Sequence, residues 1–169
     1  MIDRCEKDIR LEIEGMGIVM YSPKNMENIP DGYDYLKNEY SLPNQVAEHL
    51  RQGDVIGFCT GSGGCYNLKI RSGYPSTEIE KGNPVSIRLG IEVKDEQICF
   101  IDLFWLMEWY NECPPEQCVE LPNGYYHVTV LTKKPKSRWG DNQDIYVFFN
   151  PLEKIPHLAW TGVPQLFTE

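Results

Sequence analysis

The residues best suited to nucleophilic chemistry are a serine in a glycine-rich loop and six cysteines. Ser62 belongs to the loop Gly61-Ser62-Gly63-Gly64. A phosphate-binding loop would continue into Lys-Ser/Thr and a helix, which this loop does not. A chymotrypsin-like protease would need another order of catalytic residues and a much longer chain. We therefore interpret the loop as a hairpin turn in which glycines adopt positive φ.

The cysteines could form a Cys–His pair or a zinc site. They stand at positions 5, 59, 65, 99, 113 and 118, and the histidines at 49, 127 and 157. Cys65, Cys113 or Cys118 could pair with His127, but no local pattern supports this. Four cysteines, or three with one histidine, could bind zinc, although neither close pair has C-x-x-C spacing. We predict no catalytic residue, no metal site and no cofactor, with Cys59 and Cys99 as small buried residues in strands.

Acidic side chains are concentrated in one segment of the chain. The formal net charge is −9, and the segment from Glu92 to Glu120 contains eight acidic residues and a single base, Lys94, so it carries −7 of that total. Trp105, Trp109 and Tyr110 are interleaved with these acids. Acidic groups around exposed aromatic residues are suited to capturing a cationic protein surface. A solvated acidic face that only keeps the protein soluble is the alternative.

A set of seven residues from this segment is the predicted partner-binding site. The electrostatic contacts are expected from Glu108, Glu112, Glu116 and Glu120, and the anchors from Trp105, Trp109 or Tyr110. So negative a surface repels phosphate backbones and anionic lipids, which argues against direct nucleic-acid or membrane binding. The basic run at 133–138 is too small to change that expectation.

The elements that must position these residues are short strands. Alternating or wholly apolar runs predict strands near 9–21, 55–60, 65–71, 85–93, 98–102, 118–121, 125–132 and 144–149. Helical spacing predicts one or two short helices near residues 34–52. Residues 103–110 fit either a short helix capped by Asp102 or a continued strand. The proline-rich tail from Asn150 is expected to wrap the body as a loop.

Together these elements predict a mainly β chain that forms one domain, 1–169, with the architecture of an antiparallel β-sandwich. No apolar run approaches the roughly 18 residues needed to span a bilayer. The charged N-terminus lacks the apolar region of a secretory signal. These features favour reduced thiols and a cytoplasmic location.

The C-terminal third resembles the competence protein J family. The resemblance lies in the run from Glu120 to Thr129, an acidic residue followed by Leu-Pro-x-Gly-x-Tyr, alternating apolar residues and Thr, and in the late strand from Asp144 to Phe149. Members of this family are small cytosolic β-rich inhibitors of a DNA-entry nuclease. The resemblance therefore implies an inhibitor, without assigning any inhibitory residue.

The chain also resembles, as a class, the small acidic immunity proteins of bacterial toxin systems. It shares with them the lack of a catalytic motif and of a signal. Their toxins are commonly basic nucleases, because such enzymes must bind nucleic acid. We predict a cytosolic, non-enzymatic immunity or inhibitor protein that neutralises a basic protein toxin. The leading expectation for that toxin is a nuclease. The alternative is a small enzyme or carbohydrate-binding sandwich with a cleft near the GSGG loop and His127.

Overall fold

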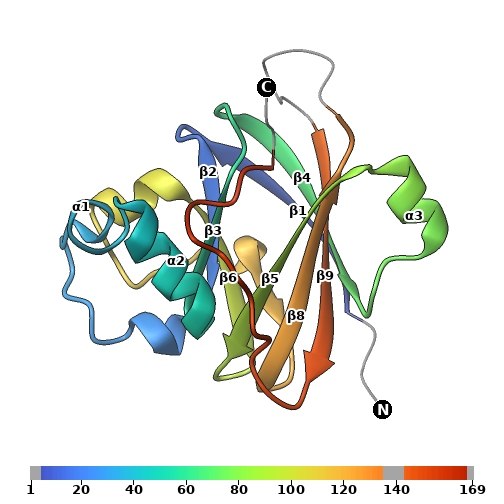
Figure 1. Ribbon diagram of the computed structural model, residues 1–169. Coiled ribbons are helices and arrows are strands. Elements are labelled where there is room, and N and C mark those ends of the chain that lie inside the picture. The colour runs from blue at the N-terminus through green and yellow to red at the C-terminus, as the bar shows by residue number, and fades with distance from the viewer. Residues whose placement is uncertain (1–4, 135–142, 167–169) are drawn as a thin grey trace.

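The computed structural model describes residues 5–134 and 143–166 as two β-sheets with short helices at their margins (Figure 1). The predicted mainly β, sandwich-like architecture is confirmed. No helix among the described residues is long and apolar enough to cross a membrane.

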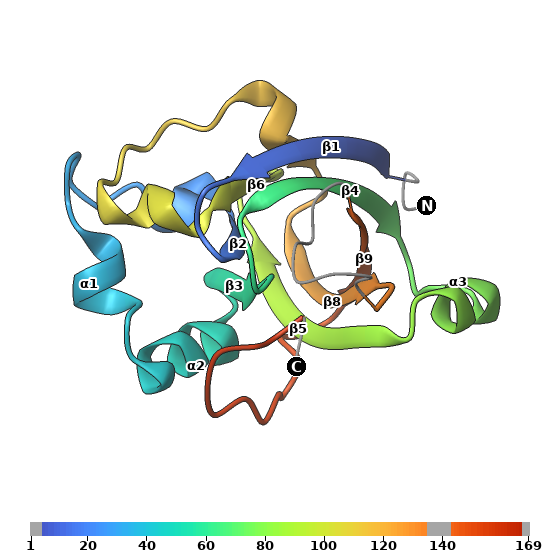
Figure 2. The ribbon, with the colours of Figure 1, turned by 90° about the horizontal axis from the view of Figure 1, so that it is seen from above.

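The larger sheet has five strands and curves strongly (Figure 2). Its spatial order is β1 (Glu6–Ile13), β4 (Gly64–Ser72), β9 (Gln143–Leu152), β8 (Gly124–Thr132) and β5 (Val85–Val93). β4 and β9 are parallel, with Leu68 opposite Ile145, whereas β1–β4, β8–β9 and β5–β8 are antiparallel. The expectation of a wholly antiparallel sheet was therefore wrong at this one pair. A parallel pair needs a long crossover, and the chain supplies one because it forms β5 to β8 between the two partners.

The smaller sheet has four strands and is antiparallel throughout. Its spatial order is β3 (Val55–Cys59), β2 (Gly17–Tyr21), β6 (Gln97–Asp102) and β7 (Cys118–Glu120). All five residues of β2 are buried, because this strand is paired on both sides and covered on both faces.

The core lies between the sheets and follows the period of the strands. In β1, Ile9, Leu11 and Ile13 are buried while the residues between them are exposed. This alternation places one face of the strand in the core and the other in water.

The helices lie at opposite sides of the molecule (Figures 1 and 2). α1 (Tyr35–Glu39) and α2 (Pro43–Gln52) occupy the region where helices were predicted. In α2, Val46, Ala47 and Leu50 form the buried face, and Gly53 ends the helix at φ 71°. α3 (Thr77–Gly82) was not predicted. It buries no residue, so its sequence lacks the apolar period that signals a helix.

The ambiguous segment 103–110 is neither an α-helix nor a strand. It forms a 3₁₀ turn, η2 (Leu103–Met107), and a second one, η3 (Pro115–Gln117), precedes β7. Asp102 caps η2, as expected, by accepting a hydrogen bond from the Phe104 N–H at 3.1 Å. Within this segment Met107 is 49% exposed, whereas Leu106 and Trp109 are buried.

The C-terminal segment from Glu153 to Leu166 runs as an irregular strap across the molecule (Figure 1). Trp160 Nε1 donates to the Arg88 carbonyl in β5 at 2.8 Å, and the Leu166 N–H donates to the Cys59 carbonyl at the end of β3 at 2.9 Å. The strap thus bridges the outer strands of the two sheets.

A further 3₁₀ turn, η1 (Pro23–Met26), follows β2.

Candidate protein-binding surface

The acidic segment leaves the smaller sheet and runs along one side of the molecule before it returns as β7. Between β6 and β7 it forms η2, which packs against α1, and η3, which packs against β1 (Figure 2). Every predicted electrostatic contact on it is solvent-exposed, namely Glu108, Glu112, Glu116 and Glu120. Glu108, Glu112 and Glu116 are exposed because they lie on the connection between β6 and β7, outside both sheets, whereas Glu120 occupies the exposed position of β7.

These four glutamates carry negative charge that the protein does not neutralise. Within residues 5–134 and 143–166, none of them forms an ion pair, and the only hydrogen bond to one of their carboxylates comes from the Tyr110 hydroxyl to Glu108 at 3.0 Å. That hydrogen bond raises the pKa of Tyr110, because it is made by the protonated phenol. Elsewhere Arg71 lies 2.9 Å from Asp8, so an acidic residue on β1 is paired within the fold.

The three predicted aromatic anchors have different environments. Tyr110 is 43% exposed, and Trp105 is half-buried with its indole N–H directed at the Tyr110 carbonyl at 3.4 Å. Trp109 is 0% exposed and packs edge-on against Tyr21 at a ring separation of 5.3 Å. Its side chain therefore belongs to the core and offers no surface to a partner. A tryptophan can serve as a core residue or as an exposed anchor, and for Trp109 the packing against Tyr21 decides for the core.

An acidic cleft of about 540 Å³ lies beside the acidic segment. It is lined by Leu11, Glu12, Ile13, Glu14, Gly64, Cys65, Asp102, Trp105 and Gln117. Glu12 comes from the exposed face of β1 and Glu14 from the turn that follows it, both far from the acidic segment in sequence. Sequence reasoning missed them as site residues, although the alternation of β1 had already indicated that they face solvent.

Asp102 positions the cleft. Its Oδ2 accepts the Glu14 N–H at 2.8 Å, and its Oδ1 accepts the N–H groups of Gly15 at 3.2 Å and Phe104 at 3.1 Å. The carboxylate therefore ties the turn after β1 to the start of η2. A Cβ on Gly15 would lie 2.7 Å from Asp102 Oδ1, so this close approach requires glycine.

The alternative site is only half present, because Gly64 of the GSGG loop and Cys65 line the acidic cleft but His127 lies far from it. His127 lies opposite Asn150 on β9, and Ser72 lies opposite Phe149, so His127 is level with the end of β4 while Gly64 begins that strand. Nine residues at about 3.3 Å each separate the two positions by roughly 30 Å. Ser62 is buried and its hydroxyl lies 3.1 Å from that of Tyr66.

His127 contacts Tyr74 rather than a cysteine or a carboxylate. Its Nδ1 lies 3.0 Å from the Tyr74 hydroxyl. Burial, together with the charge of Arg88, lowers its pKa, so the imidazole is neutral at pH 7. Of the basic run at 133–138, Lys133 and Lys134 are exposed, and 135–138 lie outside the described residues.

No protein-family model and no curated protein sequence matches the chain. Two solved structures are similar in fold. The first is ComJ from Bacillus subtilis, described as an inhibitor of the DNA-degrading activity of NucA; it is 14% identical, with a TM-score of 0.54 over 90% of this chain and 99% of that one. The chain shares the fold of ComJ. The second, described as crocagin biosynthetic gene J, is 12% identical, with a TM-score of 0.58 over 86% of this chain and 97% of that one.

The likeness to ComJ agrees with the family resemblance seen in the C-terminal residues. The superposition covers most of the chain, so the shared architecture includes the strands and helices before Glu120 as well. Because the identity is only 14%, the likeness concerns the fold.

Proposed function

We propose that this protein is a non-enzymatic inhibitor that binds and neutralises a basic protein inside the cell that makes it. The leading class of partner is a nuclease. The contact surface is the part of the acidic segment from Glu108 to Glu120, together with the adjoining acidic cleft. Trp105 and Tyr110 are its aromatic anchors.

The observation that carries the proposal is a set of exposed glutamates that lack a cationic partner within the fold. The carboxylates of Glu112, Glu116 and Glu120 accept no hydrogen bond and form no ion pair within the described residues, and the cleft beside them adds Glu12 and Glu14. The negative charge of an unpaired carboxylate is not cancelled within the protein, so it can attract an incoming cationic molecule. A half-buried tryptophan in the wall of the cleft supplies apolar contact area of the kind that dominates binding energy.

A nuclease is the fitting class of partner on charge alone. An enzyme that grips a phosphate backbone needs a basic surface around its active site. An acidic surface of similar charge density can occupy that region and is attracted to it over long range. The fold supports the same class, because ComJ is described as an inhibitor of a nuclease.

The direct test captures the partner and then measures inhibition. The tagged protein is expressed in its source organism, bound proteins are recovered at low salt, and each recovered nuclease is assayed for DNA and RNA hydrolysis with and without the protein. We expect a basic nuclease that is inhibited at equimolar protein. Recovery of basic proteins none of which degrades nucleic acid would contradict the proposal.

The surface is tested by charge reversal. The triple variant Glu108→Lys, Glu112→Lys, Glu116→Lys should slow association with the captured nuclease by about tenfold or more and flatten its dependence on salt, because steering by charge acts on the association rate. The matched control reverses three exposed glutamates elsewhere, Glu78, Glu80 and Glu153. Equal slowing in both triple variants would show that only net charge matters and would refute this surface.

A further inference from the structure

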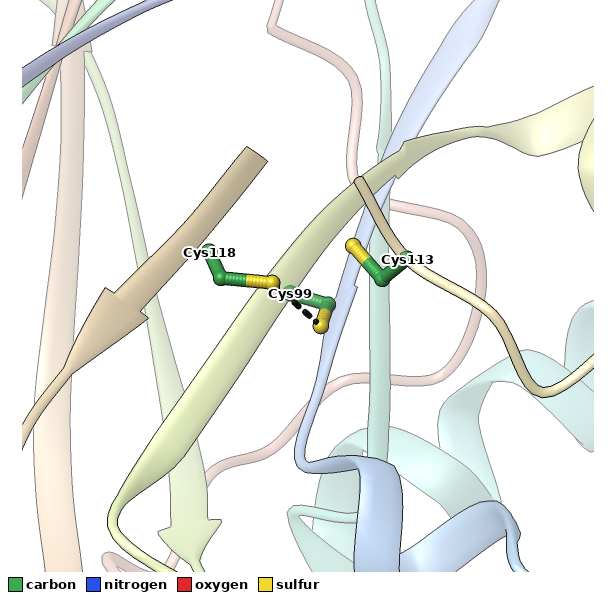
Figure 3. Close-up of side chains that lie close together, drawn as sticks. All are labelled: Cys99, Cys113 and Cys118. Atoms are coloured by element: carbon green, nitrogen blue, oxygen red, sulfur yellow. Dashed lines mark hydrogen bonds between the residues drawn. The ribbon is translucent and has the colours of Figure 1, made fainter. Parts of the chain in front are cut away.

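Three cysteine side chains converge at the outer edge of the smaller sheet (Figure 3). Cys99 in β6 lies directly opposite Cys118 in β7, and Cys113 reaches them from the loop before η3. Their three Sγ atoms all lie within 4.8 Å of one another, and those of Cys99 and Cys118 are 3.1 Å apart. We propose that Cys99, Cys113 and Cys118 together bind one thiophilic metal ion, Cu⁺ or Zn²⁺, as thiolates. This site goes beyond the proposed inhibitory function and does not depend on it.

The arrangement of the sulfurs suits such an ion. Three thiolates around a metal at about 2.3 Å lie about 4 Å from one another, so the cluster needs only small side-chain rotations. An all-sulfur ligand set selects soft ions over Mg²⁺ and Ca²⁺, which take oxygen ligands. Within the described residues, no histidine or carboxylate joins the cluster. A three-coordinate site favours Cu⁺, whereas Zn²⁺ would take a water as its fourth ligand.

A buried polar atom beside the cluster points to the same site. Tyr21 is 1% exposed and lies directly opposite Cys99 in β2, so its side chain shares the face of the sheet that carries the sulfurs. Its hydroxyl is buried, no nitrogen or oxygen among the described residues accepts from it, and the Cys99 sulfur is the group beside it. A metal-bound thiolate at Cys99 would be a stronger acceptor for this O–H than a thiol.

The backbone around the cysteines is held in place from outside the cluster. Lys7 in β1 donates to the carbonyls of Cys118 and Pro115, and Gln117 donates to the Phe100 carbonyl at 2.8 Å. These contacts fix η3 and β7 against β6, so the ligands are preorganised. Cys118 also lines a surface pocket of about 470 Å³ with Lys7 and Glu120, so this end of the cluster lies next to the protein surface.

Metal binding would also fix part of the acidic segment. Cys113 and Cys118 flank η3, which carries Glu116. An ion bound by Cys113, Cys118 and Cys99 would hold this stretch of the segment against β6. The ion would limit the motion of Glu116 without contacting it.

The test uses the full-length protein, reduced and kept free of oxygen. Cu⁺ is offered as its bicinchoninate complex, and Zn²⁺ in competition with a chromophoric chelator. We expect one ion per chain, a thiolate-to-metal absorption band in the case of Cu⁺, and protection of three thiols from alkylation. Cys113→Ser should weaken binding more than 100-fold, because a ligand is lost, and Tyr21→Phe by about tenfold, because only an outer hydrogen bond is lost.

Cys59→Ser is the matched control, since Cys59 is also half-buried but lies outside the cluster. It should bind the ion as tightly as the parent. Failure of the parent to take either ion from the chelator, or equal weakening by Cys59→Ser and Cys113→Ser, would overturn the proposal. Air oxidation of Cys99 and Cys118 to a disulfide in a protein that binds neither ion would assign the pair to redox chemistry and overturn it as well.

Discussion

Tyr110 and Trp109 are neighbours in the chain with opposite surroundings. Tyr110 is 43% exposed, whereas Trp109 is 0% exposed. The Tyr110 hydroxyl donates a hydrogen bond to the Glu108 carboxylate. The Trp109 backbone is fixed as well, because its N–H donates to the Tyr33 carbonyl at 2.9 Å and its carbonyl accepts from Gly32 at 2.6 Å. An exposed aromatic ring anchored next to a fully buried one is presented rigidly, which lowers the entropic cost of binding.

Tyr110→Ala should therefore weaken binding to the captured nuclease without destabilising the protein. We expect a loss of about 1–2 kcal/mol in binding free energy, or roughly 5- to 30-fold in Kd, because exposed aromatic anchors dominate such interfaces. Titration calorimetry gives the affinity, and urea denaturation gives the stability.

The matched control for that substitution is Tyr74→Ala. Tyr74 is 48% exposed and packs on His127 and Arg88, away from the acidic segment. It should leave the affinity unchanged. If Tyr74→Ala and Tyr110→Ala weaken binding equally, the assignment of Tyr110 as an anchor is wrong.

At the scale of elements, α2 is joined to β3 by a charged pair. His49 Nδ1 lies 2.9 Å from Asp54 Oδ1, and the Tyr35 hydroxyl lies 3.2 Å from the other ring nitrogen. Burial alone lowers the pKa of His49, but the hydrogen bond and charge of Asp54 outweigh it, so the pKa is raised. A raised pKa in the folded state stabilises the protein at low pH, and that contribution is lost as the pH rises through the folded-state value.

Asp54→Asn should remove this pH-dependent stability. The amide keeps an acceptor at the same place but not the charge, so we expect destabilisation of about 1–2 kcal/mol near pH 5.5 and little near pH 9. Thermal unfolding at the two pH values measures the difference. Glu48→Gln removes an exposed charge in the same helix that is paired with Arg51, so it should change the pH dependence of stability much less than Asp54→Asn does. An equal cost of Asp54→Asn at both pH values would contradict this account.

The sequence predicted most of the elements, because their signals are local. The alternation of β1, the β-branched and aromatic run of β8, and the apolar face of α2 follow from side-chain type and period. It did not predict α3, η2 or the parallel pairing of β4 with β9. α3 has no buried face, η2 is too short to show a period, and the pairing depends on contacts between residues about 77 positions apart.

At the scale of the molecule, the strap closes the two sheets against each other. It contacts β5, which ends the larger sheet, and β3, which ends the smaller one. Its carbonyl and N–H groups satisfy edge positions that would otherwise be open to other chains. Pro156 packs directly on Gly90, where a Cβ would lie 2.5 Å from Pro156 Cγ.

Gly90→Ala should displace the strap. We expect a loss of about 1–3 kcal/mol in stability, because the added methyl group overpacks a closed contact, and faster proteolysis beyond Leu152. Gly82→Ala is the matched control, since nothing lies within 4 Å of the position a Cβ would take there. An unchanged proteolysis pattern in Gly90→Ala would show that the strap is not held by this contact.

The sequence by itself determined the charge of the molecule, the segment that carries most of it, the mainly β architecture and a resemblance to a family of inhibitors. These properties depend on composition, on side-chain period and on short runs of residues. Only the tertiary structure decided that Trp109 is core while Tyr110 is surface, that Glu12 and Glu14 join the acidic cleft, and that three cysteines spread over 20 positions converge. Each of these outcomes depends on which strands become neighbours, and strand pairing is set by long-range packing that no local pattern encodes.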